Sequence, residues 1–90
     1  MAIHIHIHTT HRQFTKGLEV VAVQGKTVGD CLNDLVRQFP GMEKAIFAGK
    51  DKLHRVIEIF LNDSSAYPNE LAKPVKDGDQ IHLLVMLSGG

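Results

Sequence analysis

The sequence predicts an α+β fold, in which one main helix packs across a four-stranded mixed sheet in the order ββαββ. Three observations support this prediction. Residues 3–8 alternate strictly between isoleucine and histidine, residues 28–39 carry apolar side chains at helical spacing, and residues 81–87 are almost continuously apolar. These patterns are the signals of a half-buried strand, an amphipathic helix and a fully covered strand.

The composition is that of one globular domain. The 90 residues are 43% hydrophobic and 22% charged, and ten Lys and Arg residues balance ten Asp and Glu residues. A balanced charge gives no general attraction to nucleic acid or to an anionic membrane, and no apolar run approaches the roughly 20 residues of a membrane helix. The single cysteine excludes an internal disulfide, and no signal peptide is evident. We therefore expect a cytoplasmic protein, monomeric when free.

The first two strands are predicted from alternation and β-branched content. Ile3, Ile5 and Ile7 share one face of the first strand, and His4, His6 and His8 share the other. Residues 9–17 are polar and are predicted to form a loop, followed by a second strand at about residues 18–23. The two strands are expected to form a hairpin.

The main helix is predicted from its cap and its apolar stripe. Thr27 and Asp30 have the spacing of a capping box, in which each side chain accepts a hydrogen bond from an unpaired backbone N–H group. Pro40-Gly41 is expected to end the helix. The stripe falls at steps of three and four residues and consists of Val28, Cys31, Leu32, Leu35, Val36 and Phe39.

Less regular chain follows the helix. Residues 42–48 are expected to form a short helical turn, and residues 49–52 a polar loop. A third strand is predicted at residues 56–61, with Phe60 on the face opposite to the isoleucines. Residues 62–65 have turn chemistry, and residues 67–79 are predicted to be irregular.

The last strand and its tail are the stretch that the rest of the domain presents. Only His82 interrupts the large apolar residues between Ile81 and Leu87, whereas Ser88, Gly89 and Gly90 have nothing to bury. We expect a folded domain of residues 1–87 and a flexible tail of residues 88–90. If the first and last strands are central and parallel, this tail leaves from the middle of the sheet.

Several segments, taken in order, are similar to those of a known family. They are Gly25 to Leu32, Phe39-Pro40-Gly41, Asn62-Asp63, Lys76 to Asp79, and the terminal Gly89-Gly90. With these segments the chain resembles the ubiquitin-like β-grasp sulfur carriers of the MoaD/ThiS family. Residues 52–63 look most like the carriers that serve cysteine synthesis in actinobacteria, while Met86-Leu87-Ser88 and Tyr67-Pro68 depart from the family pattern.

This resemblance implies a co-substrate and not an enzyme, with no bound cofactor. A ubiquitin-activating-type enzyme would use ATP to adenylate the Gly90 carboxylate, and a sulfur donor would convert it to a thiocarboxylate. A sulfur-accepting synthase would then consume that sulfur for cysteine or homocysteine, molybdopterin or thiamin. The residues suit this chemistry. An ionised α-carboxylate, with a pKa of about 3.5, is a poor electrophile until it is activated, and Gly89-Gly90 can enter a narrow site without side chains.

A docking surface for these partners is predicted from strand parity. If Ile81, Leu83 and Val85 face the helix, the alternate residues of the last strand face outward on the open side of the sheet. Exposed apolar side chains grouped on a small domain mark a surface for a partner. The predicted partner-binding residues are Leu84, Met86, Phe60, His8, His6 and His82.

The histidines of the first strand, the single cysteine and the terminal glycines also allow other interpretations. A transition metal could bind His4, His6 and His8, but alternate residues of a strand lie about 6.6–7 Å apart and compact sites draw ligands from several elements; we predict no metal site. Cys31 lies on the apolar stripe and is expected to be a buried hydrophobe. Two alternatives to the carrier function remain: a protein modifier joined to lysines through Gly90, and a non-covalent interaction module.

Overall fold

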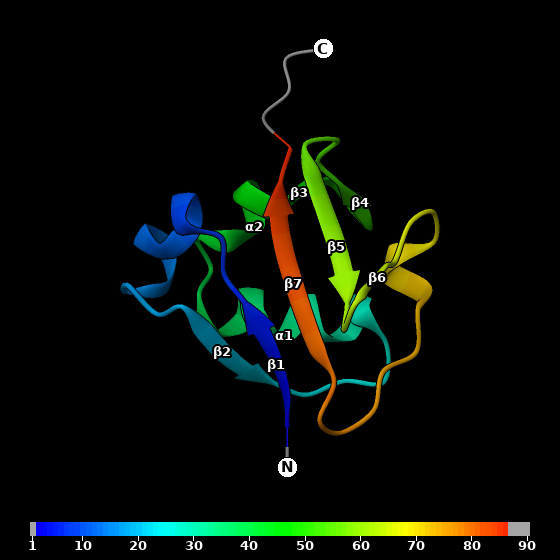
Figure 1. The fold of residues 1–90 in the computed structure, drawn as a ribbon. Coiled ribbons are helices and arrows are strands. Elements are labelled where there is room, and N and C mark those ends of the chain that lie inside the picture. The colour runs from blue at the N-terminus through cyan, green and yellow to red at the C-terminus, as the bar shows by residue number, and fades with distance from the viewer. Residues whose placement is uncertain (1, 87–90) are drawn as a thin grey trace.

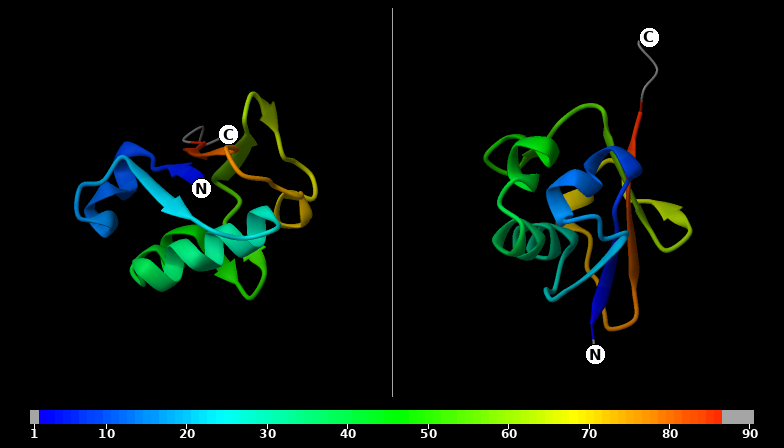
Figure 2. Two further views of the ribbon diagram at one scale, coloured as in Figure 1. Left: turned by 90° about the horizontal axis from the view of Figure 1, so that it is seen from below. Right: turned by 90° about the vertical axis from the view of Figure 1, so that its left-hand side faces the viewer.

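The computed structural model describes residues 2–86, which form a five-stranded mixed sheet with helices α1 and α2 on one of its faces (Figures 1 and 2). The strand order is β2-β1-β7-β5-β6, and the central strands β1 and β7 run parallel. The four predicted strands are confirmed, and their bounds are Ile3–His6 for β1, Val20–Val23 for β2, Ile57–Leu61 for β5 and Gln80–Val85 for β7. The predicted α+β class is therefore correct.

Three additional short strands were not predicted. The two-residue strand β6 (Ser64–Ser65) pairs with the end of β5 through a tight turn that places Asn62 at φ +56°. The strands β3 (Phe47–Gly49) and β4 (Lys52–Leu53) form a separate hairpin, so the prediction of a simple loop at 49–52 was wrong. Segments of two or three residues are too short to show an alternating pattern, and the sequence therefore carries no signal for them.

The isoleucine face of strand β1 and of the residue that follows it is buried in the core. Ile3, Ile5 and Ile7 are each at most 3% exposed, while the histidines between them are half-buried on the opposite face. Burial of each isoleucine contributes about 1.5–3 kcal/mol relative to exposure. A shift of register by one residue would bury histidines in their place, so the alternation fixes the pairing of β1.

The segment after β1 is a 3₁₀ helix, η1 (Thr9–Thr15), and not the predicted loop. His8 is its N-cap, since its Nδ1 accepts a hydrogen bond from the Thr10 backbone N–H at 3.2 Å. Lys16 ends the helix in the left-handed region, at φ +56°. Polar residues without a 3.6-residue apolar period gave no reason to expect a helix here.

Helix α1 (Val28–Gln38) begins and ends close to its predicted bounds. The Thr27 hydroxyl accepts a hydrogen bond from the Asp30 N–H, and the Asp30 carboxylate accepts one from the Lys26 N–H, both at 3.1 Å. The predicted pair is confirmed, although Asp30 reaches one residue beyond the N-cap. Short helix α2 (Met42–Ile46) also follows the prediction.

The core lies between the sheet and the two helices, as Figure 2 shows. Its members come from β1, β2, α1, α2, β5 and β7, and from Ala66. The buried hydrophobic residues are Ile3, Ile5, Ile7, Val21, Val23, Val28, Cys31, Leu32, Leu35, Met42, Ile46, Ile57, Ile59, Ala66, Ile81 and Leu83. Within residues 2–86 no helix has the length and hydrophobicity required to cross a membrane.

The long connection between β6 and β7 is held against the start of α1. It contains a short 3₁₀ helix, η2 (Glu70–Ala72), inside the region predicted to be irregular. A Cβ atom on Gly29 would lie 2.9 Å from the Leu71 carbonyl oxygen, so only glycine allows this close approach. The Val28 N–H also donates to the Lys73 carbonyl at 2.9 Å. The connection is thereby fixed before the chain enters β7.

Candidate functional site

The face of the sheet opposite the helices carries the predicted docking surface. In β7, Ile81 and Leu83 are buried in the core, whereas Leu84 is 38% exposed and Met86, just beyond the strand, is 49% exposed. The predicted parity of this strand is therefore confirmed. Met86 is held beside the start of β5, because its N–H donates to the Val56 carbonyl at 2.6 Å. Val56 is also exposed, and it extends the apolar surface at this end of β7.

A row of aligned side chains crosses the centre of this face. His6 of β1 lies opposite Val20 of β2 on one side and His82 of β7 on the other, and Phe60 of β5 lies opposite His82. We call these four residues the central row. Residues 4, 58 and 84 lie on the same face, since they are two positions away from members of the row along their strands. The open face is thus mixed, with imidazoles at its centre and apolar side chains around them.

The two histidines of the central row are in direct contact. Their ring centroids lie 4.3 Å apart with the planes inclined by only 18°, so the imidazoles are stacked. His6 Nε2 is also hydrogen-bonded to the Gln80 side-chain oxygen at 2.6 Å. The pKa of His82 lies below its ordinary value, first because the ring is partly desolvated and second because of His6, while Asp63 acts in the opposite direction. The neutral form of His82 is therefore favoured.

The remaining predicted contact residue, His8, stabilises the start of η1. Its Nδ1 lies 2.8 Å from the Thr10 hydroxyl and also caps η1, just after β1 ends. The structure thus brings His6, His82 and Phe60 together in one row, with Leu84 two residues along β7, whereas His8 lies at the start of the 3₁₀ helix. Gly89 and Gly90 lie outside the described residues.

A hydrogen-bond network that sequence reasoning missed fixes the start of β7. The Asp79 carboxylate accepts hydrogen bonds from the Lys76 N–H at 3.0 Å and from the Asn62 side-chain amide at 3.2 Å. Asn62 in turn accepts one from the Gln80 N–H at 2.9 Å. The bonds lower the pKa of Asp79, with the Lys76 backbone N–H as the largest cause. The turn at residues 62–65 was predicted from residue type, but the hydrogen bond between Asn62 and Asp79, 17 positions apart, had no signal in a single sequence.

Cys31 and the histidines of β1 do not form a second reactive site among the described residues. Burial, with a smaller effect from Asp30, raises the pKa of the Cys31 thiol to about 11, so the thiol is protonated and inert at neutral pH. Among residues 2–86, no three or more His, Cys, Asp or Glu side chains are grouped so that they could hold a metal ion.

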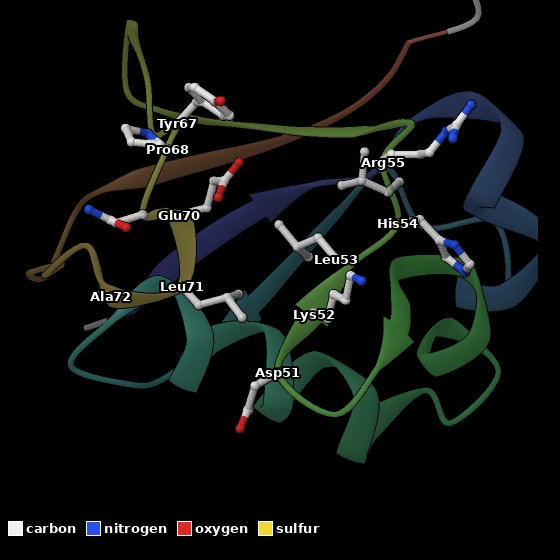
Figure 3. Close-up of a pocket in the computed structure, with 12 residues that line it drawn as sticks. Asp51, Lys52, Leu53, His54, Arg55, Tyr67, Pro68, Glu70, Leu71 and Ala72 are labelled. Carbon is white, nitrogen blue, oxygen red and sulfur yellow. The ribbon is translucent and has the colours of Figure 1, made fainter.

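A groove was also missing from the sequence-based expectations. It has a volume of about 550 Å³ and lies between the residues that follow the β3–β4 turn and the segment around η2 (Figure 3). Lys52 and His54 lie on one side, and Tyr67 and Glu70 on the other, with Leu53 and Leu71 between them. The two sides come from separate segments of the chain, so the sequence alone did not predict that they would form one groove.

The parallel central strands, the single long helix across one face and the open face beside β7 together define a ubiquitin-like β-grasp protein. The chain belongs to the ThiS family, whose family model matches residues 5–90. It is 30% identical over 93 aligned positions to the sulfur carrier protein CysO of Mycobacterium tuberculosis, with both chains covered completely. The likeness to a sulfur carrier protein and the family match support a sulfur-carrier role for this chain.

Solved structures give the same result. A chain in the crystal structure of the Amycolatopsis orientalis BexX/CysO complex matches with a TM-score of 0.88 and 31% identity, covering 99% of this chain and 100% of the other. SAMP1 of Haloferax volcanii, a small archaeal modifier protein, matches with a TM-score of 0.84 and 26% identity over the whole of both chains. The predicted β-grasp fold and the resemblance to MoaD/ThiS-like carriers are confirmed.

Proposed function

We propose that this chain carries sulfur as a thiocarboxylate on Gly90. The observation that supports the proposal most strongly is full-length similarity to a CysO sulfur carrier, together with an open, partly apolar sheet face beside the strand that leads to the terminus. The chain is a co-substrate in this scheme: it is modified by one enzyme, consumed by another and regenerated. ATP is used by the first enzyme and no cofactor is bound by the chain itself.

The proposed chemistry begins with an oxygen of the Gly90 carboxylate, which attacks the α-phosphorus of ATP and expels pyrophosphate. A nucleophilic sulfur then attacks the acyl carbon of the resulting acyl-adenylate, and AMP leaves with its bonding electrons. A carboxylate needs this activation because it is a poor electrophile in its ionised form. Gly89 and Gly90 suit the step, since neither carries a side chain that would obstruct entry to a narrow site.

Two classes of partner follow from this scheme. One is an adenylating enzyme of the ubiquitin-activating type, and the other is a sulfur-accepting synthase. The description of a CysO in complex with BexX supports the idea that a carrier of this shape docks on another protein. We place that contact on the open sheet face, at Leu84, Met86, Phe60, His6 and His82, with His8 at its border. The resemblance of residues 52–63 noted above favours a synthase of amino-acid biosynthesis over the molybdopterin and thiamin pathways.

The likeness to a small archaeal modifier protein favours one second candidate. In that function the activated Gly90 carbonyl would be attacked by a lysine amine of another protein, and AMP would leave to give an amide bond. Both functions share the activation step and differ in the nucleophile that follows it.

The test is intact-mass spectrometry of the chain after incubation with ATP, a ubiquitin-activating-type enzyme and a sulfide donor. We expect a mass increase that corresponds to replacement of one oxygen by sulfur, and no change in a variant that lacks Gly90. Attachment to lysines of other proteins would instead establish the modifier. An unchanged mass under conditions in which the enzyme activates its own carrier would contradict both covalent functions.

A further inference from the structure

The centre of the open face combines two properties that oppose one another. It lies between exposed apolar side chains, which favour contact with a dehydrated partner surface, yet it contains two titratable rings in contact. A charged imidazole loses hydration when a partner covers it, and two charged imidazoles at 4.3 Å also repel one another. Docking on this face therefore requires the uncharged form of the stacked pair.

From this geometry we propose that the stacked imidazoles of His6 and His82 make partner docking proton-linked, so that the open face binds its partner only while both rings are neutral. The proposal rests on the proposed docking function of this face. It adds a regulatory property to that function: a fall in pH through the titration of the His82 ring, which lies below the ordinary histidine range, would release the partner and leave the fold intact.

The charged and titratable groups around His6 and His82 influence how readily these rings bind protons in competition with the partner. His4 lies on the same face of β1, and His8 follows at the end of that strand. Glu58 of β5 lies opposite Leu84 on this face, and Asp63 lies in the turn after β5. The β2 member of the central row is the uncharged Val20.

Asp63 favours a positive charge on the His82 ring, whereas burial and the contact with His6 oppose it and lower its pKa. For His82 the balance is on the neutral side, because desolvation and His6 outweigh the opposing effect of Asp63. Complete coverage by a partner would increase the desolvation of His82 and lower its pKa further. The undocked face thus takes up protons at a higher pH than the docked face, which is the condition for proton-linked binding.

The pair can be replaced without loss of the fold, because neither ring belongs to the buried core. His6 Nε2 contacts the Gln80 oxygen at 2.6 Å, and both histidine side chains lie outside the buried core. Asparagine at either position keeps a polar group near the place of the imidazole Nδ1 and cannot titrate, although it does not reach Gln80 as Nε2 does. The variants His6→Asn and His82→Asn therefore separate protonation from folding.

The first measurement uses the free chain and no partner. Proton NMR should show that the His82 ring titrates below the ordinary histidine range, and that His6→Asn raises the titration midpoint of His82. His4→Asn should leave that midpoint unchanged. If His82 titrates at an ordinary value and does not respond to His6→Asn, the two rings are not coupled and the proposal is wrong, whatever any partner does.

The second measurement is the affinity for the adenylating enzyme that activates this chain in the mass-spectrometric test. Between about pH 7.5 and a pH one unit below the NMR midpoint of His82, we expect the affinity of the parent chain to fall about tenfold, because each coupled proton contributes up to about tenfold per pH unit below that midpoint. The double variant His6→Asn, His82→Asn should show no such fall, and His4→Asn should retain it. Calorimetry in buffers of different ionisation enthalpy would detect the protons released on docking.

The outcomes are distinguishable from failure of the proposed function. Binding that is equally tight across this pH range would overturn the proton linkage and leave the carrier function standing. A pH dependence that persists fully in the double variant would also overturn it, because the protons would then bind elsewhere. Failure of the chain to be activated at any pH would contradict the carrier function, and the NMR result would still decide whether the rings are coupled.

Discussion

At the scale of single residues, Asp79 has the strongest influence on how β7 is presented. It is 6% exposed, and its carboxylate joins the turn before β7 to Asn62 at the end of β5. Lys76 Nζ lies 3.4 Å from the same carboxylate, but this lysine side chain is 83% exposed. An ion pair that is so open to solvent contributes little. The shorter hydrogen bonds from the Lys76 backbone and from Asn62 therefore account for most of the effect.

This arrangement predicts how stability depends on acid. Because the pKa of Asp79 is lower in the folded state than its ordinary value of 3.8, its contribution is fully present above that value and is lost as the pH falls below it. Asp79→Asn should lower the Tm by a few degrees at neutral pH. The difference in Tm between parent and variant should then shrink between about pH 5 and about pH 2, as measured by thermal circular dichroism. A difference that stays constant over this range would refute the role assigned to the charge.

At the scale of secondary-structure elements, the start of α1 is held by a small number of identifiable hydrogen bonds. The Thr27 hydroxyl satisfies one of the unpaired N–H groups of the first turn. Its backbone also pairs with Pro74 in an isolated bridge, so the same residue connects the helix to the segment that leads into β7. The cap therefore contributes to the presentation of the open face as well as to the helix.

We predict that Thr27→Ala destabilises the protein by about 1 kcal/mol, the usual effect of removing an N-cap side chain. For a domain of this size that corresponds to a fall in Tm of about 4–8 °C. Thr27→Ser keeps the accepting oxygen and should retain most of the stability. Chemical denaturation of the three proteins would measure the difference, and equal losses for alanine and serine would show that the oxygen is not responsible.

The elements also show which parts of this fold a single sequence can predict. The isoleucine–histidine alternation of β1 and the stripe of α1 are long enough for their periods to be read, and both were placed correctly. Strand β6 and the β3–β4 hairpin have two or three residues per strand, and η1 lacks an apolar period. These elements are determined by tertiary pairing, which local sequence does not record.

The same distinction applies to the candidate site. Parity alone predicted that Leu84 and Met86 would be exposed, and that Ile81 and Leu83 would be buried. It could not predict that His6 would stack on His82, because that contact depends on the parallel register of two strands 76 residues apart in the chain. The groove beside Tyr67 likewise depends on the approach of two distant segments.

At the scale of the whole molecule, the two faces of the sheet differ in what covers them. One face is covered by helices and holds the core, and the other has no helix over it in the described part of the chain (Figure 2). The outer edge of β2 is also occupied by α1 side chains. The Gln24 N–H donates to Asp34 at 3.0 Å, and Gln38 donates to the Ala22 carbonyl at 3.0 Å. These hydrogen bonds oppose the addition of another strand at this edge, whereas the open face has no such cover from α1.

A charge in the middle of that surface should therefore separate docking from folding. Leu84 is already 38% exposed, so Leu84→Asp adds a carboxylate to a solvated position and leaves the core unchanged. On docking, the same carboxylate would be buried without a partner. We expect the affinity for the adenylating enzyme to fall about 30-fold, which corresponds to ~2 kcal/mol and is typical of a central interface residue. The rate of adenylation, measured as the ATP-dependent release of pyrophosphate, should fall together with the affinity.

The matched control is Tyr67→Asp, which introduces the same charge at a residue that is 73% exposed and lines the groove. Both variants should keep the parent circular dichroism spectrum, but only the Leu84 variant should lose adenylation. Normal adenylation of Leu84→Asp would exclude the open face as the docking surface. If Tyr67→Asp lost activity instead, the partner would have to contact the groove side of the molecule. The comparison thus tests the open face against the groove as the docking surface, because each substitution places an aspartate carboxylate on one of them.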